Sequence, residues 1–106
     1  MAARVNANNF EELVLHAGLP VLVDFYSDTC IPCKKLNGPL GDIEEDNEGK
    51  LLVYKVNVNY DEALAKQYDV ISVPTLILIK DGVEAARNIG AADYEQIDEL
   101  IVRHLL

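Results

Sequence analysis

The sequence of 106 residues contains no tryptophan, only two cysteines and half as many basic as acidic residues. Nine lysines and arginines against eighteen aspartates and glutamates give a net charge of −9, which argues against nucleic acid or an anionic membrane surface as a partner. The longest apolar runs, at residues 20–23 and 76–79, are far too short to span a membrane. Two cysteines are also too few for the disulfide framework of a small secreted protein.

The amino-terminal segment has no apolar run long enough for a signal-peptide core, so we expect a cytoplasmic protein. A cytoplasm keeps thiols reduced, so any disulfide formed there should be transient. The length suits a single domain over residues 1–106, and folding should bury roughly 65% of the surface of the unfolded chain. Such a core needs no metal or disulfide, and a monomer is the default expectation.

Strand-like and helix-like segments alternate along the chain without a repeat or a linker. The apolar and β-branched runs predict strands at residues 3–6, 20–26, 51–58, 75–80 and 83–89. Helical patterns occupy residues 9–18, 31–47 and 61–68 and the segment that begins at residue 93. Asp81 and Gly82 indicate a tight hairpin between the last two strands. The alternation predicts an α/β fold, with a central mixed sheet flanked by helices on both faces.

Two helix starts carry capping signals. Asn9 followed by Glu12 is similar to a capping box and should open a helix that Gly18 closes. Asp93 followed by Gln96 should cap the final helix, whose apolar residues recur on one side.

Cys30 and Cys33 form a C-x-x-C motif between a buried strand and the start of a helix. The unpaired amides and positive dipole end of a helix favour a thiolate, and such a site lowers a cysteine pKa well below about 8.5. Pro32 suits the first turn of a helix, where its missing N–H costs nothing. Cys33 follows one turn later, near enough to attack a mixed disulfide on Cys30.

Three other interpretations of the cysteine pair stay open. A structural disulfide would close so small a loop that the chain-entropy model gives only about 2 kcal/mol. Zinc needs four ligands, and the two histidines, His16 and His104, stand late in the terminal helices, where they complement the helix dipoles. Two inert buried thiols are the third alternative. The position at a strand-to-helix junction favours redox chemistry over all three.

Two segments of the chain resemble the thioredoxin family. VLVDFYSDTCIPCK, at residues 21–34, is similar to its active-site segment, and VPTLILIKDGVEAARNIGA, at residues 73–91, is similar to its carboxy-terminal hairpin. The resemblance runs from about Phe10 to the end of the chain. It implies the thioredoxin fold, a mixed sheet flanked by helices.

The resemblance also implies roles for individual residues. Cys30 matches the cysteine that attacks a target disulfide, and Cys33 matches the resolving cysteine that releases the reduced target. Asp24 matches a buried aspartate that moves a proton to or from the resolving thiol; burial among apolar residues should raise its pKa, unless it is a solvated strand-end aspartate. Lys55 matches the lysine that pairs with this aspartate, although a lysine at a sheet edge whose ammonium extends into water is an equal alternative.

Val73-Pro74 matches the family dipeptide with a cis peptide bond, whose backbone docks an extended target segment beside the cysteines. Gly90 matches a glycine of the same groove, although an ordinary glycine at a strand end would look alike. The expected target-binding residues surround the cysteines, and they are Thr29, Ile31, Pro32, Val73, Pro74 and Gly90.

Several positions depart from the family pattern. Thr29 stands where tryptophan is usual, Ile31 where glycine is usual, and Ser72 where glycine is common. Tyr26 replaces a frequent second tryptophan, and Pro39 lies one residue later than the helix-kinking proline of the family. None of these changes removes a chemical group that the exchange reaction needs.

The implied function is the reduction of protein disulfides by exchange through Cys30 and Cys33. No cofactor beyond the redox-active disulfide and no metal is expected, and the partners would be disulfide-containing proteins and a thioredoxin reductase as electron donor, because the chain has no flavin or nicotinamide fingerprint. A thioredoxin-like binding subunit with little turnover is the alternative. A more oxidising catalyst is a third reading, which the missing export signal disfavours.

Overall fold

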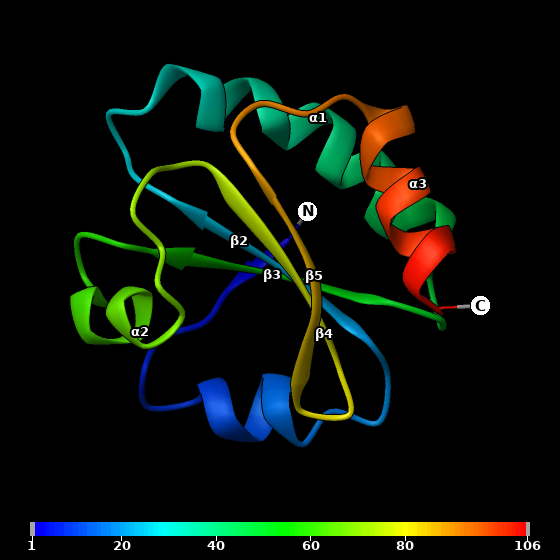
Figure 1. The fold of residues 1–106 in the computed structure, drawn as a ribbon, viewed down its shortest axis with the longest axis horizontal. Helices are drawn as coiled ribbons and strands as arrows, with labels where there is room; N and C mark the ends of the chain where they lie inside the picture. The colour runs from blue at the N-terminus through cyan, green and yellow to red at the C-terminus, as the bar shows by residue number, and fades with distance from the viewer. Residues whose placement is uncertain (1, 106) are drawn as a thin grey trace.

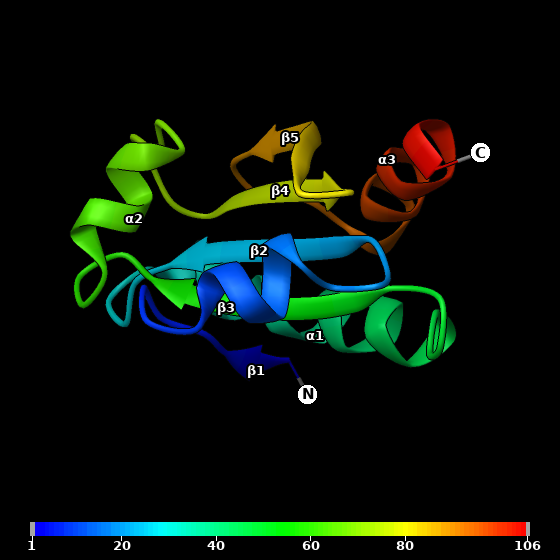
Figure 2. The same ribbon diagram turned by 90° about the horizontal axis from the view of Figure 1, so that it is seen from below.

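Among residues 2–105, which the computed structural model describes, five strands form one mixed sheet. The strands are β1 (Ala3–Arg4), β2 (Val21–Tyr26), β3 (Leu52–Asn57), β4 (Thr75–Lys80) and β5 (Val83–Ile89). Their order is β1-β3-β2-β4-β5, which Figure 2 shows from β1 at the bottom to β5 at the top. β1, β3 and β2 are parallel, whereas β4 and β5 pair antiparallel. The carboxyl ends of β2 and β3 therefore share an edge with the start of β4.

Helices cover both faces of this sheet. α1 (Ile31–Asp46) and α3 (Tyr94–Leu105) lie together on one face, while the π-helix η1 (Glu11–Leu15) and α2 (Glu62–Gln67) lie on the other (Figure 1). In Figure 2, η1 is in front of the sheet and α1 is behind it. The predicted α/β fold class, a mixed sheet with helices on both faces, is confirmed.

The side-chain alternation of β2 divides the core into two layers. Val21, Val23 and Phe25 pack with η1 and α2, whereas Leu22 packs with α1 and α3. Successive side chains of a strand point to opposite faces, so Asp24 lies on the face of Leu22, the face that α1 covers. All five residues from Val21 to Phe25 are 0% exposed, which confirms the expected strand buried on both faces.

The hairpin between β4 and β5 forms at the predicted residues. Asp81 and Gly82 have φ angles of 53° and 79°, the left-handed conformation of a tight two-residue turn. A Cβ on Gly82 would also lie 3.1 Å from the carbonyl oxygen of Leu15, at the end of η1. Gly82 is therefore required both by the turn and by the close approach of another segment.

The predicted side-chain cap of the first helix at Asn9 is wrong, although a helix forms within the predicted segment. The side chain of Asn9 accepts from the N–H of Asn6, and the side chain of Asn6 accepts from the N–H groups of Asn8 and Asn9. The helix begins after Phe10 without a side-chain cap and ends at Leu15, before Gly18. Asparagine side chains compete with the helix for backbone partners, and here they form a turn.

The capping box of the last helix is confirmed. The N–H of Gln96 donates to Asp93 Oδ1, and the N–H of Asp93 donates to Gln96 Oε1, both at 2.9 Å. The apolar side of this helix packs on the sheet through buried Ile97 and Ile101, with Leu100 and Leu105 partly buried beside them.

Replacing Asp93 with alanine should lower the free energy of unfolding by about 1 kcal/mol, because the N–H of Gln96 loses its acceptor. Urea denaturation of the oxidised protein measures this change. Asp42→Ala, at an exposed position within α1, is the control and should change stability by less than about 0.5 kcal/mol. Equal losses in the two variants would show that the cap contributes nothing specific.

α1 runs without interruption through Pro39, and its end matches the prediction to one residue, with Asn47 as the C-cap. Among residues 2–105, no helix is both long and apolar enough to cross a membrane.

Candidate active site

The C-x-x-C motif forms the amino-terminal end of α1. Cys30 is the N-cap residue, and its Sγ accepts a hydrogen bond from the N–H of Cys33 at 3.1 Å. Pro32 lies in the first turn, where no helical partner exists for a backbone N–H. The sulfur of Cys30 thus occupies the position that a capping oxygen usually takes, where an N–H group and the helix dipole favour its thiolate.

Cys30 and Cys33 are joined by a disulfide, with their Cα atoms 5.2 Å apart. Cys33 is 3% exposed, whereas Cys30 is half-buried. A second sulfur can therefore approach Cys30 from solvent, while Cys33 is covered. The neighbouring Thr29, Ile31 and Pro32 are exposed around this approach.

The segment that leads into β4 lies against Cys30. The Val73-Pro74 peptide bond is cis, as the resemblance predicts, and the carbonyl oxygen of Val73 lies 3.7 Å from Cys30 Sγ. Gly90, with φ of 96°, donates its N–H to the carbonyl of Pro74 at 2.8 Å. The structure thus brings Val73, Pro74 and Gly90 together on one side of the disulfide.

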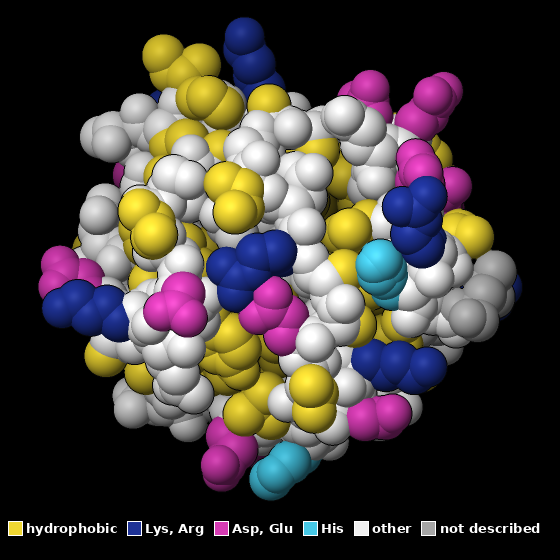
Figure 3. Space-filling model, viewed as in Figure 1, with side chains coloured by type: hydrophobic (Ala, Val, Ile, Leu, Met, Phe, Trp, Pro, Cys, Tyr) yellow, Lys and Arg dark blue, Asp and Glu magenta, His cyan; other side chains and the backbone are white. Residues whose placement is uncertain are grey.

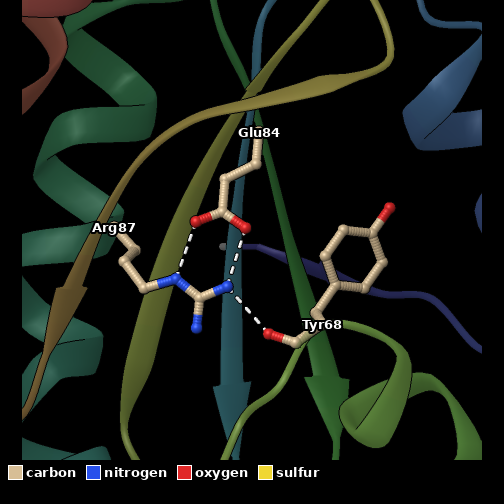
Figure 4. A network of polar contacts seen from close by, with 3 residues as sticks. All are labelled: Tyr68, Glu84 and Arg87. Carbon is tan, nitrogen blue, oxygen red and sulfur yellow. Dashed lines mark hydrogen bonds and ion pairs between the residues drawn. The ribbon is translucent and has the colours of Figure 1, made fainter.

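A charged network fixes the chain just before this segment (Figure 4). Arg87 on β5 donates from Nε and Nη2 to the two carboxylate oxygens of Glu84, each at 2.7 Å, and from Nη2 to the carbonyl of Tyr68, also at 2.7 Å. The hydrogen bond to Arg87 lowers the pKa of Glu84. Tyr68 closes α2, and Thr75 Oγ1 donates to the carbonyl of Ser72 at 2.7 Å, so the segment is held at both ends.

Asp24 is 0% exposed, and neither of its carboxylate oxygens has a hydrogen-bond partner. Burial raises the pKa of Asp24 from 3.8 to about 7, against an opposing effect of the charge on Lys55. The alternative of a solvated strand-end aspartate is excluded by this burial. A carboxyl with such a pKa exchanges its proton near neutral pH.

Lys55 neighbours Asp24, but its ammonium bonds elsewhere. The two residues are register partners on β3 and β2. Lys55 Nζ donates to Asn37 Oδ1 at 2.8 Å and lies 4.4 Å from the ring centroid of Tyr26, whereas the oxygens of Asp24 remain without a hydrogen bond. The predicted pairing is thus an electrostatic influence and not a hydrogen-bonded ion pair.

A cleft of about 290 Å³ opens beside these residues. It is lined by Tyr26, Ser27, Asp28, Cys33, Lys34, Asn37 and Lys55. The cleft thus brings the covered Cys33 and the ammonium-bearing Lys55 to the wall of one cavity.

Metal binding by the cysteines has no support in the described residues 2–105, where no cluster of three or more His, Cys, Asp or Glu could hold a metal ion. The two histidine side chains are both visible in Figure 3 and lie well apart. His16 follows η1, and His104 stands in the last turn of α3, at the helix ends where the sequence places them.

Two residues of this region were not predicted from the sequence, Asn37 and Arg87. Asn37 stands four residues after Cys33, a spacing that puts both on one side of α1 and could have suggested a contact. Arg87 reaches Tyr68 across 19 positions and has no comparable local signal.

A disulfide at the start of a helix, an accessible outer sulfur and a buried carboxyl on the adjacent strand define a class, the thiol–disulfide exchange proteins. A sequence model described as Thioredoxin matches residues 1–103. The chain is 41% identical over 104 residues to "Thioredoxin" of Chlamydia caviae, covering 98% of this chain and 99% of that protein. It is 35% identical over 101 residues to "Thioredoxin" of Haemophilus influenzae, covering 95% and 94% of the two chains.

The chain therefore belongs to the thioredoxin family, and the resemblance found in the sequence is confirmed. It is a thiol–disulfide oxidoreductase of the protein-disulfide reductase type, with the Cys30–Cys33 pair as its redox centre. Members of this family generally reduce the disulfides of target proteins and are reduced by a thioredoxin reductase.

Proposed function

We propose that this chain reduces protein disulfides in two steps, with Cys30 as the attacking and Cys33 as the resolving cysteine. The observation that carries these roles is the difference in access, because Cys33 is 3% exposed and Cys30 is half-buried at the N-cap of α1. Only the outer sulfur can be reached by the disulfide of a folded partner.

In the first step, the Cys30 thiolate attacks one sulfur of the target disulfide. A Cys30–target disulfide forms, the target disulfide breaks, and the other target sulfur leaves as a thiolate. In the second step, the Cys33 thiolate attacks the sulfur of Cys30. The Cys30–Cys33 disulfide forms and the second target thiolate leaves, so two electrons have passed from the pair to the target.

Asp24 is proposed to accept the proton that Cys33 must lose before it attacks. Asp24 lies on the α1 face of β2, and its pKa of about 7 suits proton transfer near neutral pH. Lys55 is proposed to tune this carboxyl, since its positive charge favours the ionised form.

The target segment is proposed to lie extended along Val73 and Pro74, where the Val73 carbonyl faces the reacting sulfur. Gly90, the residue after β5, would also border this site, because its N–H already donates to the Pro74 carbonyl. The exposed side chains beside Cys30 would contact the target on the opposite side, and they are Thr29, Ile31 and Pro32.

The partners proposed for this chain are disulfide-containing proteins and a thioredoxin reductase that restores the dithiol. The reaction runs toward reduced targets in a compartment that keeps thiols reduced, so we infer a cytoplasmic setting for it. No metal or organic cofactor enters either step.

Insulin reduction tests this function, with dithiothreitol as the electron source. The chain at catalytic concentration should accelerate the precipitation of reduced insulin well above the rate with dithiothreitol alone. The Cys30→Ser, Cys33→Ser double variant is the control and should give no acceleration. If the unsubstituted chain gave no acceleration, the proposed reductase activity would be ruled out. The alternative function, a thioredoxin-like binding subunit with little turnover, would then be favoured.

A further inference from the structure

Lys55 is held by two contacts in the cleft that Cys33 also lines. Its ammonium donates to Asn37 Oδ1 on α1 at 2.8 Å and lies over the ring of Tyr26, 4.4 Å from its centroid. Asn37 is one helical turn beyond Cys33, so the two side chains share a side of α1. All four residues line the same cleft of about 290 Å³.

The same lysine is the cation that acts on Asp24. Lys55 and Asp24 are register partners on neighbouring strands, and the apolar residues two positions before each, Val53 and Leu22, both pack with α1. Their side chains therefore leave the sheet on the same face. Asp24 has no hydrogen-bond partner, so its ionised form is stabilised by the charge of Lys55. The strength of this stabilisation depends on where the ammonium lies.

From this juxtaposition we infer that Asn37 is a positioning residue, which keeps the Lys55 ammonium in the cleft beside the buried carboxyl of Asp24 and the sulfur of Cys33. The inference rests on the proposed proton transfer through Asp24. The side chain of Asn37 bonds to Lys55 and not to either sulfur, so it acts through Lys55.

If Asn37 is replaced and its hydrogen bond is lost, the Lys55 ammonium should move outward into water. Moving inward, toward a carboxyl that is 0% exposed, would cost desolvation of the ammonium. Moving outward into water costs nothing comparable and restores the rotamer freedom of a long side chain. Without Asn37, the positive charge therefore leaves Asp24, and the carboxyl holds its proton to a higher pH.

The other charged or titratable groups near Asp24 are the same in the unsubstituted chain and in a chain without Asn37. The cleft carries Asp28 from the loop, Lys34 from α1 and Tyr26 from β2, and in the oxidised chain Cys33 does not titrate because it is part of the disulfide. On the remaining side, the β4 partner of Asp24 is the buried, apolar Leu76. Replacing Asn37 removes none of these charges, so a shift reports on the movement of Lys55.

The test follows the Asp24 carboxyl carbon by NMR against pH in the oxidised full-length chain. Asn37→Ala should raise the titration midpoint of Asp24 by roughly 0.5 to 1 pH unit, a part of the 1–3 units that an adjacent opposite charge supplies. Asn8→Ala, at an exposed asparagine in the turn before η1, is the matched control and should leave the midpoint unchanged.

A double-mutant cycle isolates the proposed route. In a Lys55→Met background, Asn37→Ala should shift the midpoint no further, because the cation that it positions is absent. An unchanged midpoint in Asn37→Ala, a downward shift, or a shift that persists in Lys55→Met would overturn the inference. A second readout is the release of a target from its Cys30 mixed disulfide, whose pH profile should move with the midpoint. The titration needs no turnover, so a chain inactive on insulin would still report on Asn37.

Discussion

Cys33→Ser should convert the chain into a trap that stays covalently bound to its target, whereas Cys30→Ser should lose both trapping and turnover. In Cys33→Ser the Cys30 thiolate still attacks, but no second thiol is present to break the mixed disulfide. In Cys30→Ser the remaining thiol is Cys33, which is 3% exposed and beyond the reach of a folded target. Both variants should reduce insulin no faster than dithiothreitol alone.

The mixed disulfide is measured by mass spectrometry after the reduced variant is mixed with a protein that carries a single accessible disulfide. Cys33→Ser should gain the mass of one target per chain, and dithiothreitol should reverse it. The double variant is the control and should gain none. Equal trapping by Cys30→Ser would show that Cys33 is accessible in solution and would reverse the assigned order of attack.

The difference between the two sulfurs comes from backbone positions that the sequence already indicates. A buried strand that ends shortly before Cys30 and Pro32 predicts a helix start, and Cys30 is indeed its N-cap. Local signals of this kind also located the β4–β5 hairpin at Asp81-Gly82 and the reciprocal cap of Asp93 and Gln96. In each case the information lies within three or four neighbouring residues, so spacing alone carries it.

Two kinds of feature were not predicted from the sequence. One depends on competition between side chains for the same backbone N–H groups, and the other on contacts between residues far apart in the chain. Asn6 and Asn9 both accept backbone N–H groups, so a capping pattern at Asn9 did not reveal that the asparagines would form a turn instead. The contact between Lys55 and Asn37 joins a strand to a helix 18 positions away, and only the packing of α1 on the sheet decides it. Arg87 likewise binds a backbone carbonyl, which any residue at position 68 would present.

Asp24→Asn should stabilise the oxidised protein at alkaline pH and should leave its stability nearly unchanged near pH 4. Folding raises the pKa of Asp24 from 3.8 to about 7, so between these values the folded chain binds a proton that the unfolded chain has released. Stability from this group is present in full below pH 3.8 and is lost as the pH rises through about 7. The slope is about −1.4 kcal/mol per pH unit, which amounts to about 4 kcal/mol over the window.

Urea denaturation between pH 4 and pH 8 measures this window, with the difference between the variant and the unsubstituted protein taken at each pH. Other titrating groups are common to both proteins and cancel in the difference. Asp42→Asn makes the same chemical change at an exposed position of α1 and is the control for the substitution itself. A flat curve for Asp24→Asn would show that the carboxyl is solvated in solution or is neutral throughout.

The same variant should slow the release of reduced target, which opposes the gain in stability. A neutral amide cannot take the proton from Cys33, so the mixed disulfide with Cys30 should persist longer at pH 7 and should resolve faster as added base ionises Cys33 directly. Stopped-flow measurement of target release across this pH range detects the change.

A buried carboxylate without a partner costs the fold several kcal/mol at pH 8, and a neutral isostere would remove that cost. Faster unfolding together with unchanged release in Asp24→Asn would contradict both halves of this account, since the carboxyl would then serve the fold and not the exchange reaction.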